Sequence, residues 1–310
     1  MGLIIEHEKL DREFYSFFTR RGYTKLDPVG ITSRVDDTVY LVNSATNLFK
    51  PFISNNDTRI FVAQPSMRTQ ILNDYYCQET ETEYPTCFKS LGVYVSLNYL
   101  QMLIDDCVEF FLHIGFETSK MRIRVSYDDI MLLDVATKSI IGKSIVFDSK
   151  SEKYEHNYGL NLTGRAIKLD YYQDWSAKHK NLCYFIIISE NGIPKGAEMA
   201  TSDQLIVMRQ NNLKYAISAS KIAEILPTET FIQRRFADSI VGASNMIYER
   251  IRPNSSNTNG RTIKKYIKAT RFFGELQKIS QDDIIMIICD YINFEFSCAL
   301  KTDVICSYFN

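Results

Sequence analysis

The sequence predicts an α+β protein, in which an antiparallel sheet flanked by helices is followed by an all-helical domain. Three observations support this class. Strands recur at irregular intervals, without the regular helix alternation of a parallel α/β fold. Residues 183–189 are almost wholly apolar, as in a strand buried on both faces. From Phe231 onward the apolar residues follow helical spacing to the end of the chain.

The composition is that of a soluble globular protein. The 310 residues are 45% hydrophobic and 24% charged, with a net charge of −1, which suffices for a substantial core and two domains. No window approaches the roughly 18 uncharged apolar residues of a membrane helix, and the N-terminus lacks a secretory pattern. The seven cysteines and four histidines are scattered. We therefore expect reduced thiols, a cytoplasmic location and no structural zinc.

The N-terminal third combines one helix with several strands. Apolar residues at helical spacing predict an amphipathic helix over residues 6–21, which stops at Gly22. Strands are expected at residues 38–42, 59–62 and 91–95, because these runs are rich in β-branched and aromatic residues.

The middle of the chain continues the sheet. A helical stripe covers residues 97–115, and residues 121–126 alternate as in a strand with one solvated face. Residues 144–155 are polar and lysine-rich, which predicts a surface loop or hairpin. The apolar run at residues 183–189 is expected to be a central strand.

The C-terminal region is expected to form a separate helical domain. The break near Pro227 divides the chain into a predicted catalytic-type domain, 1–226, and a helical domain, 227–310, with a strongly apolar helix around residues 284–292. Residues 231–278 carry ten Lys and Arg against three Asp and Glu, a local charge of +7. Clustered cations indicate a docking face for a polyanion, although cations that only solvate helix faces give the same composition.

An Asn-rich loop at residues 254–259 precedes the most basic helix. The minor groove of RNA is wide and shallow and offers 2′-hydroxyls and base edges to short amide side chains. The predicted RNA-binding residues are Asn257, Asn259, Arg261, Lys264, Lys265, Lys268 and Arg271.

Several segments resemble the alanyl-tRNA synthetases, which are class II synthetases. Residues 47–51 read Asn-Leu-Phe-Lys-Pro, similar to the Asn-x-Phe-Lys-Pro spelling near the start of that catalytic domain. Residues 64–68 and 86–92 resemble class II motif 2, in which a strand with an arginine, a loop and a returning strand follow in order. Residues 231–276 resemble the helices that bind the tRNA acceptor stem. The resemblance covers almost the whole chain and implies a class II synthetase-like sheet.

The resemblance implies that ATP activates an amino acid as its adenylate. Negative charge then develops on the α-phosphate and the leaving pyrophosphate, and a fixed guanidinium can pair with those oxygens. Arg68 is predicted to do so, a surface salt bridge being the alternative. Lys89 stands where the family usually has a glutamate, which reverses the local electrostatics. The predicted catalytic residues are Arg68, Lys89 and Arg209, and the predicted ATP-binding residues are Arg68, Asn73, Asp74 and Phe88.

The segment expected to hold class II motif 3 departs from the family. Residues 199–207 have neither its glycines nor its arginine in register, and the position of the carboxylate that holds the substrate's α-amino group aligns with Ala200. A shift of register would allow Glu198 or Asp203 to supply the acid and Arg209 the arginine. The predicted substrate-binding residues are Asn47, Lys50, Trp175, Cys183, Glu198 and Asp203; for the single tryptophan a place in the core is the alternative.

The resemblance leaves two main functions open. One is a ligase that uses ATP and Mg²⁺ to activate a small amino acid, and transfers it to the acceptor stem of a tRNA or to a carrier protein in specialised metabolism. The other is a catalytically inactive paralogue that binds RNA or protein. We expect a stand-alone paralogue without the family's editing and C-terminal domains, and neither DNA nor a membrane as partner. Unrelated chemistry on the same fold is a third possibility.

Overall fold

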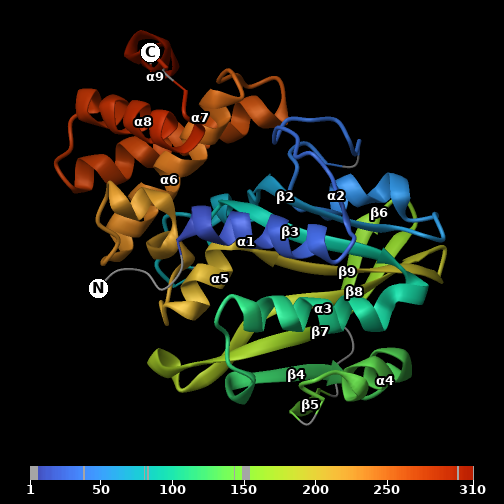
Figure 1. Ribbon diagram of the computed structural model, residues 1–310. Coiled ribbons are helices and arrows are strands. Elements are labelled where there is room, and N and C mark those ends of the chain that lie inside the picture. The colour runs from blue at the N-terminus through green and yellow to red at the C-terminus, as the bar shows by residue number, and fades with distance from the viewer. Residues whose placement is uncertain are drawn as a thin grey trace.

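The computed structural model describes residues 6–37, 39–79, 81, 84–142, 144–148, 154–298 and 300–309. These residues form a mixed, mostly antiparallel sheet with flanking helices, and four helices gather at one end of the molecule (Figure 1). The strands are β1 (Thr24–Lys25), β2 (Arg59–Met67), β3 (Cys87–Ser96), β4 (Met121–Ser126), β5 (Ile145–Asp148), β6 (Glu155–Gly159), β7 (Leu162–Gln173), β8 (Lys178–Glu190) and β9 (Ile193–Ser202). The α-helices are α1 (His7–Arg20), α2 (Thr46–Phe49), α3 (Leu100–His113), α4 (Ile130–Lys138), α5 (Asp203–Gln210), α6 (Phe231–Tyr248), α7 (Thr258–Leu276), α8 (Gln281–Phe296) and α9 (Thr302–Phe309).

The sheet order is β1-β2-β3-β9-β8-β7-β4-β5, and β6 pairs with β7. The pairs β1–β2 and β4–β5 are parallel, whereas the other pairs are antiparallel. The apolar run at residues 183–189 lies inside β8, in the middle of this order, so the prediction of a central strand is confirmed. The predicted α+β class is confirmed as well.

Helix α1 shows why an amphipathic sequence takes this place in the fold. Its apolar residues recur at helical spacing and bury one face, with Phe14 and Phe18 both 0% exposed. The Phe14 ring centroid lies 5.6 Å from that of Phe61 on β2 and 5.6 Å from that of Phe110 on α3. Buried aromatic rings contribute large apolar areas, and edge-to-face contacts add to that stabilisation. This core covers the sheet face opposite the candidate site.

The C-terminal helices pack around a second hydrophobic core, an apolar cluster that they share with the β2–β3 hairpin. Helix α6 begins with a capping box, in which Thr230 Oγ1 accepts from the Gln233 N–H and the Gln233 side chain accepts from the Thr230 N–H. The same apolar cluster includes residues of the β2–β3 hairpin, namely Met67, Leu72, Tyr75 and Cys87. The hairpin therefore contributes apolar side chains to the core of the helical region, across the predicted boundary at residue 227.

Two predicted elements differ from the structure. Residues 39–42 are not a strand: Val42 makes isolated backbone hydrogen bonds to Ile31 and Met67, whereas a strand needs a continuous ladder. Thr38 lies outside the described residues. Within the predicted loop at 144–155, Ile145–Asp148 pairs in parallel with β4 as an edge strand, and residues 149–153 are not described.

Candidate functional site

The β2–β3 hairpin has the strand, loop and returning strand predicted from its sequence. Arg68 directly follows β2, and its backbone N–H donates to the carbonyl of Thr86 at 2.9 Å, just beyond the Met67–Cys87 pair. The Arg68 guanidinium carbon lies 4.9 Å from the centroid of the Phe88 ring. The hairpin thus presents a cation and an aromatic ring side by side.

A cavity of about 150 Å³ opens beside this hairpin. Its wall combines the aromatic rings of Tyr84, Phe88 and Tyr184 with small polar residues. The lining residues are Ser44, Arg68, Tyr84, Pro85, Phe88, Ser90, Asn181, Tyr184, Ala200, Thr201, Ser202 and Leu205. Asn181 Oδ1 is buried and makes no hydrogen bond to another described residue.

Arg68 is the cation that lines the cavity among the described residues. Desolvation lowers the pKa of Arg68, which nevertheless stays a cation at neutral pH because guanidinium is a very weak acid. Lys168 of β7 does not line the cavity, but its Nζ lies 5.4 Å from the centroid of the Tyr184 ring, which does. Burial, and next the nearby charges of Lys168 and Arg68, lower the pKa of His156. Neighbouring cations of this kind attract an anionic ligand.

The other two predicted catalytic cations do not line this cavity. Successive side chains of a strand point to opposite faces, so Phe88 faces the cavity and Lys89 faces α1. There Lys89 Nζ pairs with Asp11 Oδ2 at 2.5 Å. Arg209 is 1% exposed, and its Nε donates to the backbone carbonyl of Asn181 at 2.9 Å. Arg68 is therefore the one predicted catalytic residue that the described cavity contains.

The two candidate acids lie on opposite faces of the sheet. Asp203, at the start of α5, accepts from the Lys89 N–H at 3.0 Å and pairs with His7 Nδ1 at 3.1 Å. Glu198 is on β9, on the same face as Ala200 of the cavity, but it is 0% exposed. Its carboxyl accepts from Thr46 Oγ1 at 2.7 Å, and burial raises its pKa to about 8. Glu198 is thus mostly protonated at pH 7.

Asn47 and Lys50 hold the segment that brings Ser44 to the cavity. Asn47 Oδ1 accepts from the Ser44 N–H at 3.3 Å, and its Nδ2 donates to Asp36 Oδ2 at 2.8 Å. Lys50 Nζ lies 2.5 Å from Asp36 Oδ2 and donates to the Tyr158 carbonyl at 2.6 Å. Both side chains are hydrogen-bonded or ion-paired to other protein groups, and neither residue lines the cavity.

The remaining predicted pocket residues lie elsewhere. Cys183 is 0% exposed in the core on the opposite face of the sheet. Trp175 lies in the β7–β8 connection, with Lys180 Nζ 5.0 Å from its ring centroid. Asn73 Oδ1 accepts from Lys265 Nζ of α7 at 3.3 Å, and Asp74 follows it in the hairpin loop. Of the predicted ATP-binding residues, Arg68 and Phe88 line the cavity, whereas Asn73 and Asp74 do not.

A second cavity, of about 220 Å³, shares Arg68 with the first. It lies between the hairpin and the start of α7, where Tyr40, Gln70, Thr258 and Asn259 line it. Asn259 Nδ2 donates to the Tyr40 carbonyl at 3.2 Å. Asn257 is the N-cap of α7, and its Oδ1 accepts from the Gly260 N–H at 2.7 Å. Of the two predicted RNA-binding asparagines, Asn259 therefore lines a cavity and Asn257 caps a helix.

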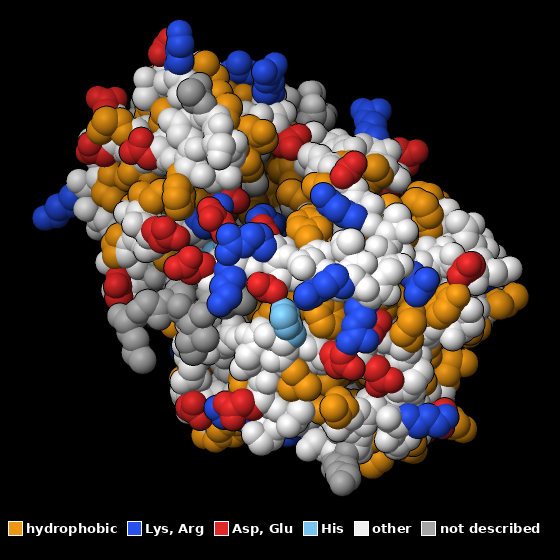
Figure 2. Space-filling view, viewed as in Figure 1, with side chains coloured by type: hydrophobic (Ala, Val, Ile, Leu, Met, Phe, Trp, Pro, Cys, Tyr) orange, Lys and Arg blue, Asp and Glu red, His pale blue; other side chains and the backbone are white. Residues whose placement is uncertain are grey.

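The basic residues of α7 gather at a third, wider cavity of about 490 Å³ between α7 and α9. Its lining residues are Arg252, Pro253, Lys264, Ile267, Lys268, Arg271, Ser307, Tyr308 and Phe309, so no acidic residue lines it. On the face in Figure 2, by contrast, Lys and Arg are mixed with Asp and Glu. Of the other predicted RNA-binding cations, Arg261 donates to Thr258 Oγ1 at 3.1 Å, and Lys265 contacts Asn73.

No group of three or more His, Cys, Asp and Glu among the described residues is placed to hold a metal ion. The described helices also include none that is long and apolar enough to cross a membrane. Asn181 and Tyr184 are not among the residues predicted from the sequence, and both lie in the cavity wall.

The antiparallel sheet, the arginine-bearing hairpin and the cavity beside it define a catalytic domain of the class II aminoacyl-tRNA synthetase type. Residues 9–182 match the family described as tRNA synthetases class II (A). The chain belongs to this family, the alanyl type of class II synthetases. No curated protein matches it in sequence.

Solved structures of class II synthetases match this chain at low sequence identity. Asparaginyl-tRNA synthetase from Pyrococcus horikoshii matches with a TM-score of 0.43 and 10% identity over 69% of this chain and 65% of that chain. Apo histidyl-tRNA synthetase from S. aureus gives 0.38 and 11% over 66% and 70%. PylSc, a pyrrolysyl-tRNA synthetase from Desulfitobacterium hafniense, gives 0.42 and 8% over 68% and 71%. The chain thus spans about two thirds of the length of these proteins.

Proposed function

We propose that the protein activates a small amino acid with ATP as its aminoacyl adenylate and transfers it to an acceptor. The observation that carries this proposal is the position of Arg68 at the junction of two cavities, next to Phe88. A guanidinium there can pair with the α-phosphate, and an aromatic ring beside it provides a face on which adenine can stack.

The same cavity supports a site for the amino acid. Asn181 lines it, and a side-chain amide has an oxygen that can accept a hydrogen bond from an α-ammonium group. Glu198 is mostly protonated at pH 7, so it does not supply a negative charge for the α-ammonium group. The cavity's volume of about 150 Å³ suits a small side chain better than a large one.

Mg²⁺ fits this reaction as a companion of the nucleotide. It prefers phosphate oxygens and retained waters to a cage made only of protein ligands. The described residues contain no group of three or more His, Cys, Asp and Glu placed to hold a metal ion. Bound there, Mg²⁺ would neutralise part of the charge on the leaving pyrophosphate.

The acceptor proposed is the end of an RNA such as tRNA. Three cations of α7 and Arg252 line one cavity, and Asn259 lines the cavity that leads to Arg68. An RNA phosphate backbone needs such a cluster, and binding to it weakens steeply with salt. A carrier protein is the other acceptor, and a Kd that does not change with salt would favour it over RNA.

ATP–pyrophosphate exchange across the common amino acids tests the proposal. Arg68→Ala is expected to lower the exchange rate at least about a hundredfold, because losing one preorganised charge contact costs ~3–4 kcal/mol in the transition state. Arg68→Lys keeps the charge without the bidentate geometry and should restore part of the rate. Arg59→Ala removes an arginine from the other end of β2 as a matched control.

The second candidate function is a catalytically inactive binding module. It is favoured by Lys89 and Arg209, which do not line the cavity, so that Arg68 has no second cation there from the predicted catalytic set. Folded protein that gives no exchange with any amino acid, yet still binds RNA, would establish this function and reject the ligase.

A further inference from the structure

Asp238 of α6 is buried against the end of the β2–β3 hairpin and is 4% exposed. Its Oδ1 accepts from the Thr86 N–H at 2.8 Å, and its Oδ2 accepts from Thr86 Oγ1 at 2.7 Å and from the Tyr75 hydroxyl at 2.7 Å. A buried carboxylate is costly unless hydrogen bonds compensate its desolvation. Here all three donors come from one hairpin, so the helix and the hairpin stabilise each other.

Thr86 connects Asp238 to Arg68. The Thr86 carbonyl accepts from the Arg68 N–H at 2.9 Å. Arg68 is the first residue past β2, so this bond fixes the backbone from which the guanidinium leaves toward the cavity. Three residues in contact, Asp238, Thr86 and Arg68, thus link α6 to the proposed nucleotide site.

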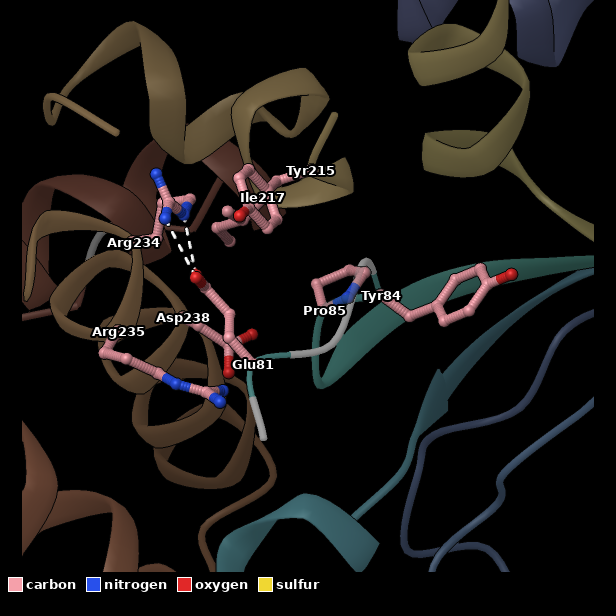
Figure 3. A pocket seen from close by; sticks show the side chains of 8 residues that line it. All are labelled: Glu81, Tyr84, Pro85, Tyr215, Ile217, Arg234, Arg235 and Asp238. Carbon is pink, nitrogen blue, oxygen red and sulfur yellow. Dashed lines mark hydrogen bonds and ion pairs between the residues drawn. The ribbon is translucent and has the colours of Figure 1, made fainter. Parts of the chain in front are cut away.

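A second contact joins α6 to the hairpin loop without involving Arg68. Arg234 forms a bidentate pair with Glu81, with Nε–Oε1 at 2.7 Å and Nη2–Oε2 at 2.9 Å. Figure 3 shows this pair joined by dashed lines, with Asp238 on the same helix beside it. Among the described contacts between α6 and the hairpin loop, the one at Asp238 continues through Thr86 to Arg68, whereas the Arg234–Glu81 pair does not.

We propose that Asp238 is a positioning residue that acts on Arg68 through Thr86. Asp238 thereby couples the helical region to ATP binding. This inference rests on the proposed function, since Arg68 is the residue proposed to contact the triphosphate. Residues in one hydrogen-bonded chain are coupled energetically, and such coupling is reciprocal between two binding sites. A ligand that moves α6 would change the affinity for ATP by this route.

A double-mutant cycle on ATP affinity tests the proposal. The Kd of MgATP is measured by calorimetry for wild type, Asp238→Ala, Arg68→Ala and the double variant. Asp238→Ala is expected to raise Kd about tenfold when Arg68 is present and to change it by no more than about twofold when Arg68 is absent. Asp238→Asn keeps an acceptor for the Thr86 N–H and should fall between wild type and Asp238→Ala.

Glu81→Gln is the matched control, because it weakens a contact between α6 and the loop that does not involve Asp238. If positioning of Arg68 is specific to Asp238, Glu81→Gln leaves Kd within about twofold of wild type. An equal rise in Kd for Asp238→Ala with and without Arg68 would overturn the proposal, since it would show a general loss of structure.

Amide hydrogen exchange separates this inference from the proposed function. In the ligand-free protein, Asp238→Ala is expected to accelerate exchange of the Arg68 N–H while the amides of β8 keep their protection. Unchanged exchange at Arg68 overturns the inference whether or not ATP binds. Absence of ATP binding to wild type, with faster exchange at Arg68 in the variant, overturns the proposed function and supports the positioning.

Discussion

Glu198 provides a prediction whose size follows from its surroundings. Its carboxyl is 0% exposed on β9, and burial raises its pKa from 4.5 to about 8, with the Thr46 hydrogen bond opposing the rise. A difference of this size between folded and unfolded states is worth about 5 kcal/mol, at ~1.4 kcal/mol for each tenfold change in the ionisation constant. Because the unfolded state ionises first, wild type loses stability as pH rises from about 4.5 to about 8.

Glu198→Gln removes the ionisation and keeps the shape and the hydrogen bond to Thr46 Oγ1. We therefore expect the variant to be several kcal/mol more stable than wild type at pH 9 and to differ little from it at pH 4.5. Urea unfolding monitored by the fluorescence of Trp175, the single tryptophan, at a series of pH values measures this difference.

Thr46→Val sharpens the test because it removes the hydrogen bond that lowers the pKa of Glu198. In that background, the loss of stability should move to higher pH. Curves of stability against pH that run parallel in wild type and Glu198→Gln would refute the reasoning, since they would show that Glu198 ionises equally in the folded and unfolded states.

Three other predictions concern the rest of the molecule. Burial lowers the pKa of His7, but the hydrogen bond and charge of Asp203 outweigh this effect, so the pKa is raised overall. The ion pair should therefore stabilise the fold fully below pH ~6.5 and less as pH rises through the pKa of the folded state. Urea titrations of His7→Gln should no longer show this trend. Lys268→Ala is expected to weaken RNA binding without sequence preference and to reduce the slope of log Kd against log salt by about 0.7–0.9, and an unchanged slope would remove this residue from the interface. Thr230→Ala should lower the free energy of unfolding by about 1 kcal/mol through loss of the capping box, whereas Thr230→Ser should retain it.

Local sequence patterns were sufficient for most elements. The helix at α1 and the helices from Phe231 onward follow from apolar spacing, because a single buried face requires a regular period. Strands β2 and β3, which are buried on both faces, follow from their content of β-branched and aromatic residues. The prediction of a strand was wrong for residues 39–42, because β-branched residues also occur in extended segments that form no ladder of hydrogen bonds with a neighbouring strand. The parallel pairing of β5 with β4 also escaped it, because pairing partners are distant in sequence.

The candidate site was predictable only in part. Arg68 and Phe88 were predicted from the local spelling of the hairpin, and both line the cavity. Lys89 and Arg209 were also predicted, but neither lines it: strand alternation turns Lys89 toward α1, and Arg209 is buried within α5, where its Nε donates to the carbonyl of Asn181.

The family, the α+β class and the arginine of the hairpin could be predicted from the amino-acid pattern, because each depends on residues close together in the chain. Which polar groups share a cavity depends on how distant segments pack. Asn181 and Arg68 line one cavity although they are more than 100 residues apart in the chain, and Asp238 accepts a hydrogen bond from Thr86, 152 residues away. Such pairs form because burying a charge or an amide is unfavourable without a partner, and the fold alone decides which partner is within reach.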